Sequence, residues 1–232
     1  HGGTLMDSNV LFLPELILIA SILAVPAIYI ATNSTKSYSI CSNISLAVSL
    51  LVVILFWYSP DSVSFDKSSS SYVIYDHFVI NDFSQLFKVI FLLSALAVSI
   101  ISSSYFKEDE PHQAEYYVLL LSSALGMLIT ASANDFLTIF VGIELSAFSS
   151  YGLVAFRKTD DKSTEAGAKY LLIGAFSSAL TLYGISLLYA LTGSVTFEGV
   201  NAFLTGIDNG VIDGDFNELI FISSLFIIAG LG

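Results

Sequence analysis

Six long apolar runs determine what this chain can fold into. A helix needs about 20 predominantly apolar residues to cross the hydrocarbon core of a bilayer. The six runs are Val10–Ala31, Ile40–Tyr58, Phe83–Phe106, Tyr116–Ser132, Asp135–Phe156 and Ala166–Leu191. A seventh run begins near Leu219 and stops at Gly232, which is too short to span. We therefore predict an all-α integral membrane protein with about six complete transmembrane helices and part of a seventh.

The charge content agrees with this prediction and excludes several classes of protein. Charged residues make up 12% of the 232 residues, whereas soluble domains carry about 25%. The net charge of −12 is opposite to the surplus of Lys and Arg that nucleic acids and anionic membrane surfaces recruit. A single cysteine, Cys41, excludes an internal disulfide framework and a cysteine-ligated iron–sulfur site. None of the three histidines lies in an apolar run, so we predict no metal site.

The basic residues between the runs predict the orientation of the chain. Lys and Arg resist translocation across the membrane. If the six runs alternate in direction, only Lys67 falls on one side. The other five fall together on the opposite side: Lys36, Lys107, Arg157, Lys158 and Lys162. We therefore expect these basic loops to be cytoplasmic and the N-terminus to lie outside.

Two segments on the predicted outer side have their own patterns. Tyr72–Ile80 alternates and is rich in β-branched and aromatic residues, which predicts a short hairpin. Thr192–Asn217 is rich in Gly and Asp and is interpreted as a solvated, acidic loop. Its DGDFNE stretch has a calcium-loop beginning, but Glu218 stands where that loop requires glycine.

Glu144 is the most informative charge, because it lies about nine residues into the fifth run, or about 13 Å from its start. A charge at this depth costs about 2.5–3.5 kcal/mol, so its default interpretation is functional. Ala147, Phe148 and Tyr151 follow at i+3, i+4 and i+7 and are expected to surround it. Glu144 could be a titrating site, with a pKa that burial raises and a cationic partner lowers. Alternatively, it could be a protonated acid that only forms a hydrogen bond to a neighbouring helix. We favour the titrating site.

Three other charges lie within apolar runs. Lys169 stands four residues into the sixth run, where a functional role and snorkelling to the interface are both open. Its depth differs from that of Glu144 by about 12 Å, so no direct salt bridge is expected. Glu15 and Lys88 lie near the outer ends of their runs and are interpreted as interfacial.

Small and hydroxylated residues crowd the sixth run. Gly174 and Ser178 form a small-xxx-small pair, which favours tight helix packing over the entry of water. The chain contains no Gly-rich phosphate loop, no paired-carboxylate hydrolase signature and no Ser/His/Asp set. We therefore expect no chemistry on an organic substrate.

The stretch from Met127 to Ser194 carries a family resemblance. It contains the elements SANDxLTxFxGxEL, YxLVAF, STEAxxKYxxxGAxSSxxxLYGxxLLY and TGS. Together they resemble the N subunit of the respiratory complex I, or NADH-quinone oxidoreductase, family, which is an antiporter-like, proton-pumping membrane subunit. The earlier YDHFVINDFSQLFKVIFLL resembles the hairpin and third helix of that subunit.

The resemblance implies an antiporter-like fold of about fourteen transmembrane helices with inverted repeats. Residues 1–114 would form helices one to three with the outer hairpin, and residues 115–232 would begin the first repeat. We expect the chain to be an N-terminal piece of a longer protein, with its natural start at Met6.

The resemblance also implies a function, which is proton translocation in the membrane arm of a complex I-like oxidoreductase. Such a complex is a NADH:quinone oxidoreductase-type translocase, and its electron transfer takes place in other subunits, so no cofactor is expected here. Glu144 matches the family's helix-five glutamate and Lys169 its helix-six lysine, which is assigned to proton uptake. The helix-seven lysine expected to pair with Glu144 falls beyond Gly232. The implied partners are other membrane subunits, the lipid bilayer of a prokaryotic plasma membrane, and protons, without nucleic acid.

Two alternatives stay open at this stage. One is a subunit of a multisubunit cation/proton antiporter, which shares the helix-five glutamate. The other is a non-transporting membrane scaffold in which Glu144 and Lys169 only pin helices. NADH, a reduced deazaflavin and ferredoxin are all compatible electron donors, and both protons and sodium are compatible transported ions.

Overall fold

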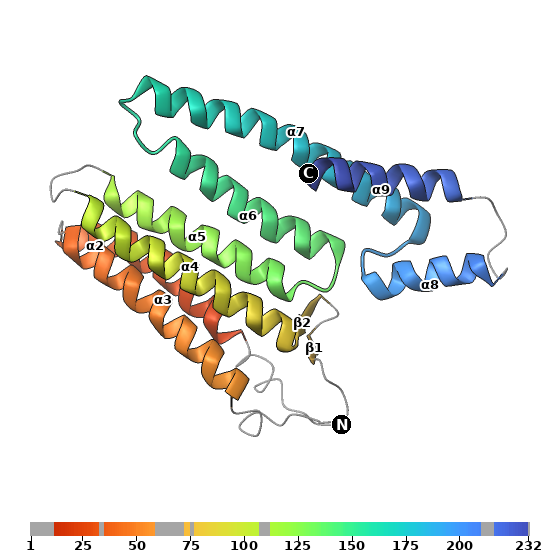
Figure 1. The fold of residues 1–232 in the computed structure, drawn as a ribbon, viewed down its shortest axis with the longest axis horizontal. Coiled ribbons are helices and arrows are strands. Elements are labelled where there is room, and N and C mark those ends of the chain that lie inside the picture. The colour runs from red at the N-terminus through yellow and green to blue at the C-terminus, as the bar shows by residue number, and fades with distance from the viewer. Residues whose placement is uncertain are drawn as a thin grey trace.

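The computed structural model describes residues 12–32, 35–58, 72–74, 77–106, 112–209 and 216–231. This part of the chain holds eight helices and one two-stranded hairpin (Figure 1), which confirms the predicted all-α class. The helices are α2 Leu13–Thr32, α3 Thr35–Tyr58, α4 Asp82–Tyr105, α5 Gln113–Ser132, α6 Phe136–Val154, α7 Asp161–Thr192, α8 Phe197–Asp208 and α9 Asn217–Leu231. The strands are β1 Tyr72–Ile74 and β2 Phe78–Ile80.

The helices α2 to α7 have the length and apolar composition needed to cross a membrane, which confirms the six predicted spans. Their outer surfaces carry large apolar side chains; Ile30 is 84% exposed and Leu172 is 72% exposed. The start of α7 differs from the prediction. It begins at Asp161 rather than Ala166, because the Asp160 side chain accepts a hydrogen bond from the Lys162 amide at 3.0 Å and caps the helix earlier.

The helices α2 to α5 form one packed bundle, and α6, α7 and α9 extend from it (Figure 1). The apolar core of the bundle includes Leu46, Leu92, Leu121 and Leu128, all inaccessible to solvent. We call the end with β1 and β2 the hairpin end. The opposite end, which carries Arg157, Lys158 and Lys162, is the basic end.

Glycines bring two pairs of helices into close contact. A Cβ added at Gly126 of α5 would lie 2.6 Å from the carbonyl oxygen of Gly142 in α6. A Cβ added at Gly184 of α7 would lie 2.7 Å from the carbonyl oxygen of Ser223 in α9. Neither backbone pair leaves room for a side chain, so α6 is held closely against α5 and α9 closely against α7.

The two predictions on the outer segments had different outcomes. The hairpin is confirmed: β1 and β2 pair antiparallel, with Tyr72 opposite Ile80. The interpretation of Thr192–Asn217 as a plain loop is wrong for its first half, which forms α8. The Thr196 hydroxyl accepts a hydrogen bond from the Gly199 amide at 3.1 Å and caps that helix. The acidic stretch at 210–215 lies outside the described residues.

The interpretation of Glu15 and Lys88 as interfacial is also wrong. Lys88 Nζ in α4 lies 2.7 Å from Glu15 Oε1 in α2, and the two side chains are only 1% and 8% exposed. Neither carboxylate oxygen has a hydrogen bond of regular geometry, so the contact is an ion pair. Both helices begin at the hairpin end, and their packing encloses the two charges before either side chain reaches the interface.

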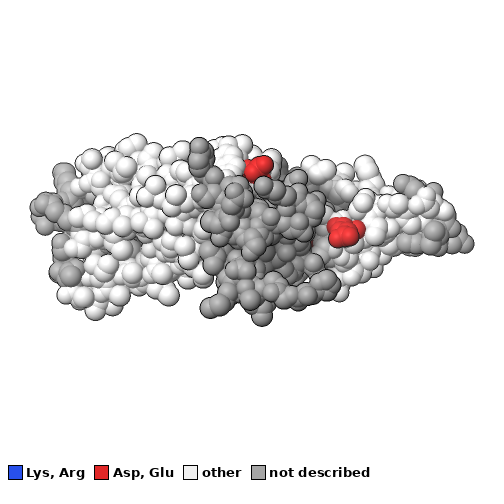
Figure 2. Space-filling model, turned by 90° about the horizontal axis from the view of Figure 1, so that it is seen from below, with Lys and Arg blue, Asp and Glu red and all other residues white. Residues whose placement is uncertain are grey.

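Figure 2 shows the molecule from below relative to Figure 1. Among the described residues on this face, acidic side chains are visible and no lysine or arginine is. Most of the described surface on this face is uncharged.

Candidate functional site

Glu144 lies where the sequence predicted it. It is the ninth residue of α6, which runs from Phe136 to Val154, and so lies about 12 Å along the axis from the first residue. The residue is partly buried. A carboxylate therefore stands close to the middle of a membrane-spanning helix.

The Glu144 side chain has a partner on α7. The hydroxyl of Ser178 donates a hydrogen bond to Glu144 Oε1. The same hydroxyl lies 3.0 Å from the carbonyl oxygen of Gly174, one turn earlier in α7. The expected cationic partner of Glu144 is not found among the described residues, and a neutral hydroxyl occupies the contact instead.

A cavity of about 150 Å³ opens beside the two side chains, between α6, α7 and α9. Besides Glu144 and Ser178, its polar lining includes Ser177, Thr181 and Tyr151. Its apolar lining includes Ile143, Ala147 and Ile227. One liquid water occupies about 30 Å³, so the space is large enough for water beside the carboxylate.

Tyr151 closes one side of this cavity and is 8% exposed. A Cβ at Gly174 would collide with the Tyr151 hydroxyl oxygen, so the glycine allows the phenol to lie against α7. Ala147 and Tyr151 thus surround Glu144 as predicted, whereas Phe148 is 58% exposed and is not part of the lining. Gly174 allows the close approach of α6 and α7 that the small-xxx-small pair predicted, and together with Ser178 it also lines the cavity.

Lys169 does not contact Glu144. Its ammonium pairs with Glu165, one turn earlier in α7, and the two side chains are 69% and 64% exposed. Along α7, Lys169 lies nine residues, or about 14 Å, from Ser178, the residue that contacts Glu144. This separation agrees with the predicted difference in depth between Lys169 and Glu144. The ring of Tyr170, its neighbour in sequence, contacts Tyr151 with centroids 4.7 Å apart. An aromatic contact therefore lies between the level of Lys169 and that of Glu144.

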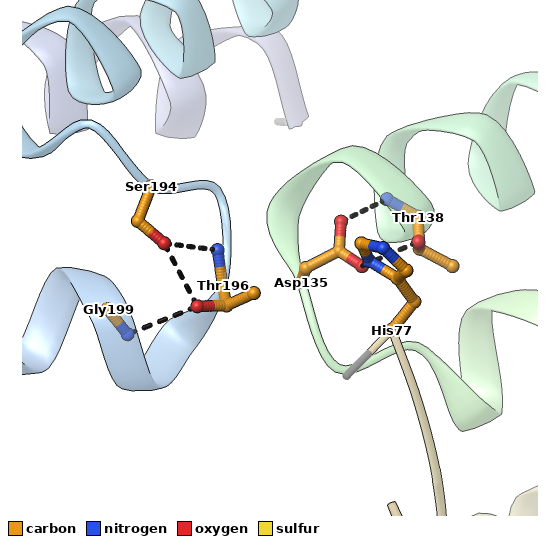
Figure 3. A network of polar contacts seen from close by, with 6 residues as sticks. All are labelled: His77, Asp135, Thr138, Ser194, Thr196 and Gly199. Atoms are coloured by element: carbon orange, nitrogen blue, oxygen red, sulfur yellow. Dashed lines mark hydrogen bonds and ion pairs between the residues drawn. The ribbon is translucent and has the colours of Figure 1, made fainter. Parts of the chain in front are cut away.

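Three loops at the hairpin end hold α6 in place (Figure 3). Asp135 is inaccessible to solvent and caps α6, accepting from the Thr138 amide at 2.7 Å and the Thr138 hydroxyl at 2.6 Å. His77 Nδ1, from the turn of the hairpin, lies 2.9 Å from Asp135 Oδ2, the oxygen that also accepts from the Thr138 hydroxyl. The Phe136 amide donates to the Val195 carbonyl at 3.1 Å. We call these three segments, at His77, Asn134–Phe136 and Val195–Thr196, the loop clamp.

Hydrogen bonds determine the ionisation of Asp135. Burial opposes the charged form and alone would raise its pKa, but hydrogen bonds from the Thr138 side chain and backbone and from His77 outweigh it. The pKa of Asp135 therefore lies below its ordinary value. The clamp is fixed by an ionised carboxylate, nine residues before Glu144.

Sequence reasoning missed three of these features: the Ser178 contact, the Asp135 cap and the Glu15–Lys88 pair. Asp135 was visible as an N-cap residue, since Asp before an apolar run is a helix-start signal. Among the described residues, no group of three or more His, Cys, Asp or Glu side chains is placed to hold a metal ion.

The fold and the site define a polytopic α-helical membrane protein with a carboxylate facing a mid-membrane cavity. Residues 133–232 match the family model described as NADH:quinone oxidoreductase/Mrp antiporter, TM, so this part of the chain belongs to that family. Over 226 residues it is 33% identical to NADH-quinone oxidoreductase subunit N of Erythrobacter litoralis, covering 97% of this chain and 44% of that protein. Over 152 residues it is 41% identical to the subunit N of Desulfitobacterium hafniense, covering 66% and 29%. The chain thus spans less than half the length of these curated relatives.

Solved structures share the fold. A chain of respiratory complex I from Thermus thermophilus superposes with a TM-score of 0.70 at 23% identity, over 94% of this chain and 43% of that one. A chain of the archaeal membrane-bound sulfane sulfur reductase superposes with a TM-score of 0.76 at 22% identity, with the same coverage. At these identities the likeness establishes the arrangement of helices, which confirms the antiporter-like fold class.

Proposed function

We propose that this chain is the proton-translocating part of a membrane-arm subunit in a complex I-like oxidoreductase. The observation that carries the proposal is Glu144, a mid-helix carboxylate that faces a cavity and accepts a hydrogen bond from the Ser178 hydroxyl. The cavity offers water or a proton direct access to this carboxylate. The named relatives are subunits of NADH-quinone oxidoreductase, in agreement with this role.

Lys169 is proposed as the group that takes part in proton uptake. Its side chain is exposed near the basic end and pairs with Glu165, one turn earlier in the same helix. Along α7, Gly174, where the Tyr151 hydroxyl lies, is about 8 Å from Lys169, and Ser178 is about 6 Å further. Lys169, Tyr151 and Glu144 thus follow one another from the basic end toward the middle of the membrane-spanning helices.

Within the complex, the basic end is proposed to face the cytoplasm and the hairpin end the outside. Arg157, Lys158 and Lys162 are at the basic end, and the positive-inside rule then gives the orientation. Other membrane subunits supply the driving electron transfer, and this chain carries no redox centre in the proposal. Its location is the plasma membrane of a prokaryotic cell.

A second candidate is a subunit of a cation/proton antiporter. The matching family model covers both the oxidoreductase and the Mrp antiporter subunits, and the Glu144 cavity would serve either. Sodium flux separates the two, because an antiporter moves sodium against protons without a redox substrate.

The test replaces Glu144 by Gln, which keeps size and hydrogen bonding and removes the charge. In the assembled complex in membrane vesicles, Glu144→Gln should leave assembly intact and abolish most proton flux. Glu144→Asp should retain an intermediate flux, because the charge survives on a shorter side chain. Glu198→Gln, at an exposed position in α8, is the matched control and should pump normally. A fully assembled Glu144→Gln complex with normal flux would falsify the translocation role, and loss of flux only in proportion to lost complex would support the scaffold alternative.

A further inference from the structure

The hydroxyl of Ser178 has one proton and two acceptors within reach. One acceptor is Glu144 Oε1 on the neighbouring helix. The other is the carbonyl oxygen of Gly174 on its own helix, at 3.0 Å. A hydroxyl can donate only one strong hydrogen bond at a time, but it can also accept one. The direction of the hydrogen bond between Ser178 and Glu144 therefore depends on whether Glu144 is protonated.

The two protonation states of Glu144 require opposite directions. An ionised carboxylate can only accept, so the Ser178 hydroxyl must donate to Oε1. A protonated carboxyl can donate to Ser178 Oγ, and the Ser178 proton then turns to the Gly174 carbonyl. Ser178 neither gains nor loses a proton in this exchange. Glu144 takes up or releases its proton on the cavity side. No other group gains or loses a proton in this exchange.

We propose that Ser178 is a positioning residue that sets the proton affinity of Glu144 by reversing its hydrogen bond as Glu144 titrates. This inference rests on the proposed function and adds a residue that acts through Glu144. The local geometry favours it, because the Gly174 carbonyl is the resting acceptor that many helical serines already use. The hydroxyl therefore has a partner in both states.

Few other groups compete for this role. Among the described residues that line the cavity, Tyr151 on α6 is the one titratable group besides Glu144. From α7 the lining contributes neutral hydroxyls, Gly174 and Ile185, and from α9 it contributes Ile227, Gly230 and Leu231. On the α5 side, Ser146 of α6 bonds Ser123 at 3.1 Å. Ser178 is thus the group whose hydrogen bond to Glu144 responds directly to its charge.

The test is the pH dependence of proton flux in vesicles containing the assembled complex. Ser178→Ala removes the donor to the ionised carboxylate, so the protonated form gains and the midpoint of the flux profile should move to alkaline pH. Because Ser178 also bonds the protonated form, the shift is the difference between a charged and a neutral hydrogen bond, which is about one pH unit. Ser178→Thr keeps the hydroxyl and should retain the original midpoint. Ser178→Cys, a weaker donor, should shift it in the same direction by less.

Two controls separate this inference from packing effects. Ser186 of α7 is exposed and bonds the Tyr183 carbonyl at 2.7 Å, so Ser186→Ala should leave the midpoint in place. Ser178→Ala added to Glu144→Gln should have no further effect on the residual flux. An unmoved midpoint in Ser178→Ala and Ser178→Cys, with Glu144→Gln inactive, would overturn the role of Ser178 alone. Normal flux in Glu144→Gln would overturn the proposed function and this inference together.

Discussion

Glu15 and Glu144 are both carboxylates within membrane-spanning helices, and the protein treats them in opposite ways. Glu15, in the packed bundle of α2 to α5, contacts the Lys88 ammonium at 2.7 Å and is 8% exposed. Glu144 faces a cavity of about 150 Å³ and is bonded by a hydroxyl. Glu15 thus has a charged partner in a packed core, whereas the described partner of Glu144 is a neutral hydroxyl beside space for water.

Packing explains why the two sites differ. In the bundle, apolar side chains such as Leu18 and Leu92 fill the space around α2 and α4. Around Glu144, the close glycine contacts join α5 to α6 and α7 to α9, and the cavity lies where these two pairs meet. The comparison teaches that a buried charge in a membrane protein indicates function only after its partner and its surroundings are known.

The largest expected effect comes from breaking the Glu15 ion pair. Lys88→Met leaves a carboxylate buried without compensation, which costs about 3–5 kcal/mol. We expect assembled complex to fall sharply in amount and in thermal midpoint. The double variant Glu15→Gln/Lys88→Met removes both charges and should recover most of the assembly. If the double variant assembled normally but no longer pumped, Glu15 would have a transport role and the contrast with Glu144 would disappear.

A second test addresses the packing that borders the cavity. In Gly126→Ala the added methyl would lie 2.6 Å from two backbone atoms of α6, so the helices must separate, at a cost of about 1–3 kcal/mol. The control is Gly152→Ala in α6, whose methyl would meet the tip of the Leu119 side chain at 2.9 Å and can displace it. The thermal midpoint of the complex should fall in the first variant and change little in the second. Equal midpoints would show that the α5–α6 contact tolerates separation.

Asp135 gives a third kind of buried carboxylate, compensated by hydrogen bonds at the hairpin end. Because its pKa is lowered below the ordinary value of 3.8, its stabilisation is fully present above that value. The stabilisation is lost as the pH falls through the lower pKa of the folded state. Hydrogen-exchange protection of the Asn134 and Phe136 amides, corrected for intrinsic rates, should therefore show no contribution from Asp135 titration between pH 5 and 8. Asp135→Asn keeps a good cap and should lower protection by about 1 kcal/mol; unchanged protection would mean that the clamp does not depend on the charge.

The sequence predicted the features that depend on a single segment of the chain. Run lengths predicted the six spans, alternation predicted the hairpin, and spacing placed Glu144 at the middle of α6. Contacts between segments were not accessible in this way. Glu15 and Lys88 are 73 positions apart, and their only signal was opposite charge near the same ends of two spans. The Ser178 contact depends on how α6 and α7 cross. The cap at Thr196, by contrast, is local, so the start of α8 was accessible from the sequence and was missed.

The smallest expected effect on stability is that of replacing Lys169. This test separates a charge that stabilises the fold from a charge that takes part in transport. Its ion pair with Glu165 is exposed and lies within one helix, and such pairs contribute about 0.3–0.5 kcal/mol. Lys169→Ala should therefore leave the thermal midpoint of the complex almost unchanged while slowing proton flux. Lys169→Arg should keep much of the flux, because it preserves charge and reach.

Lys162→Ala, at another exposed position of α7, is the matched control for loss of a surface charge near the basic end. If the Lys169 and Lys162 alanine variants pumped at the same rate, Lys169 would be a surface residue like its control, and uptake would have to begin elsewhere.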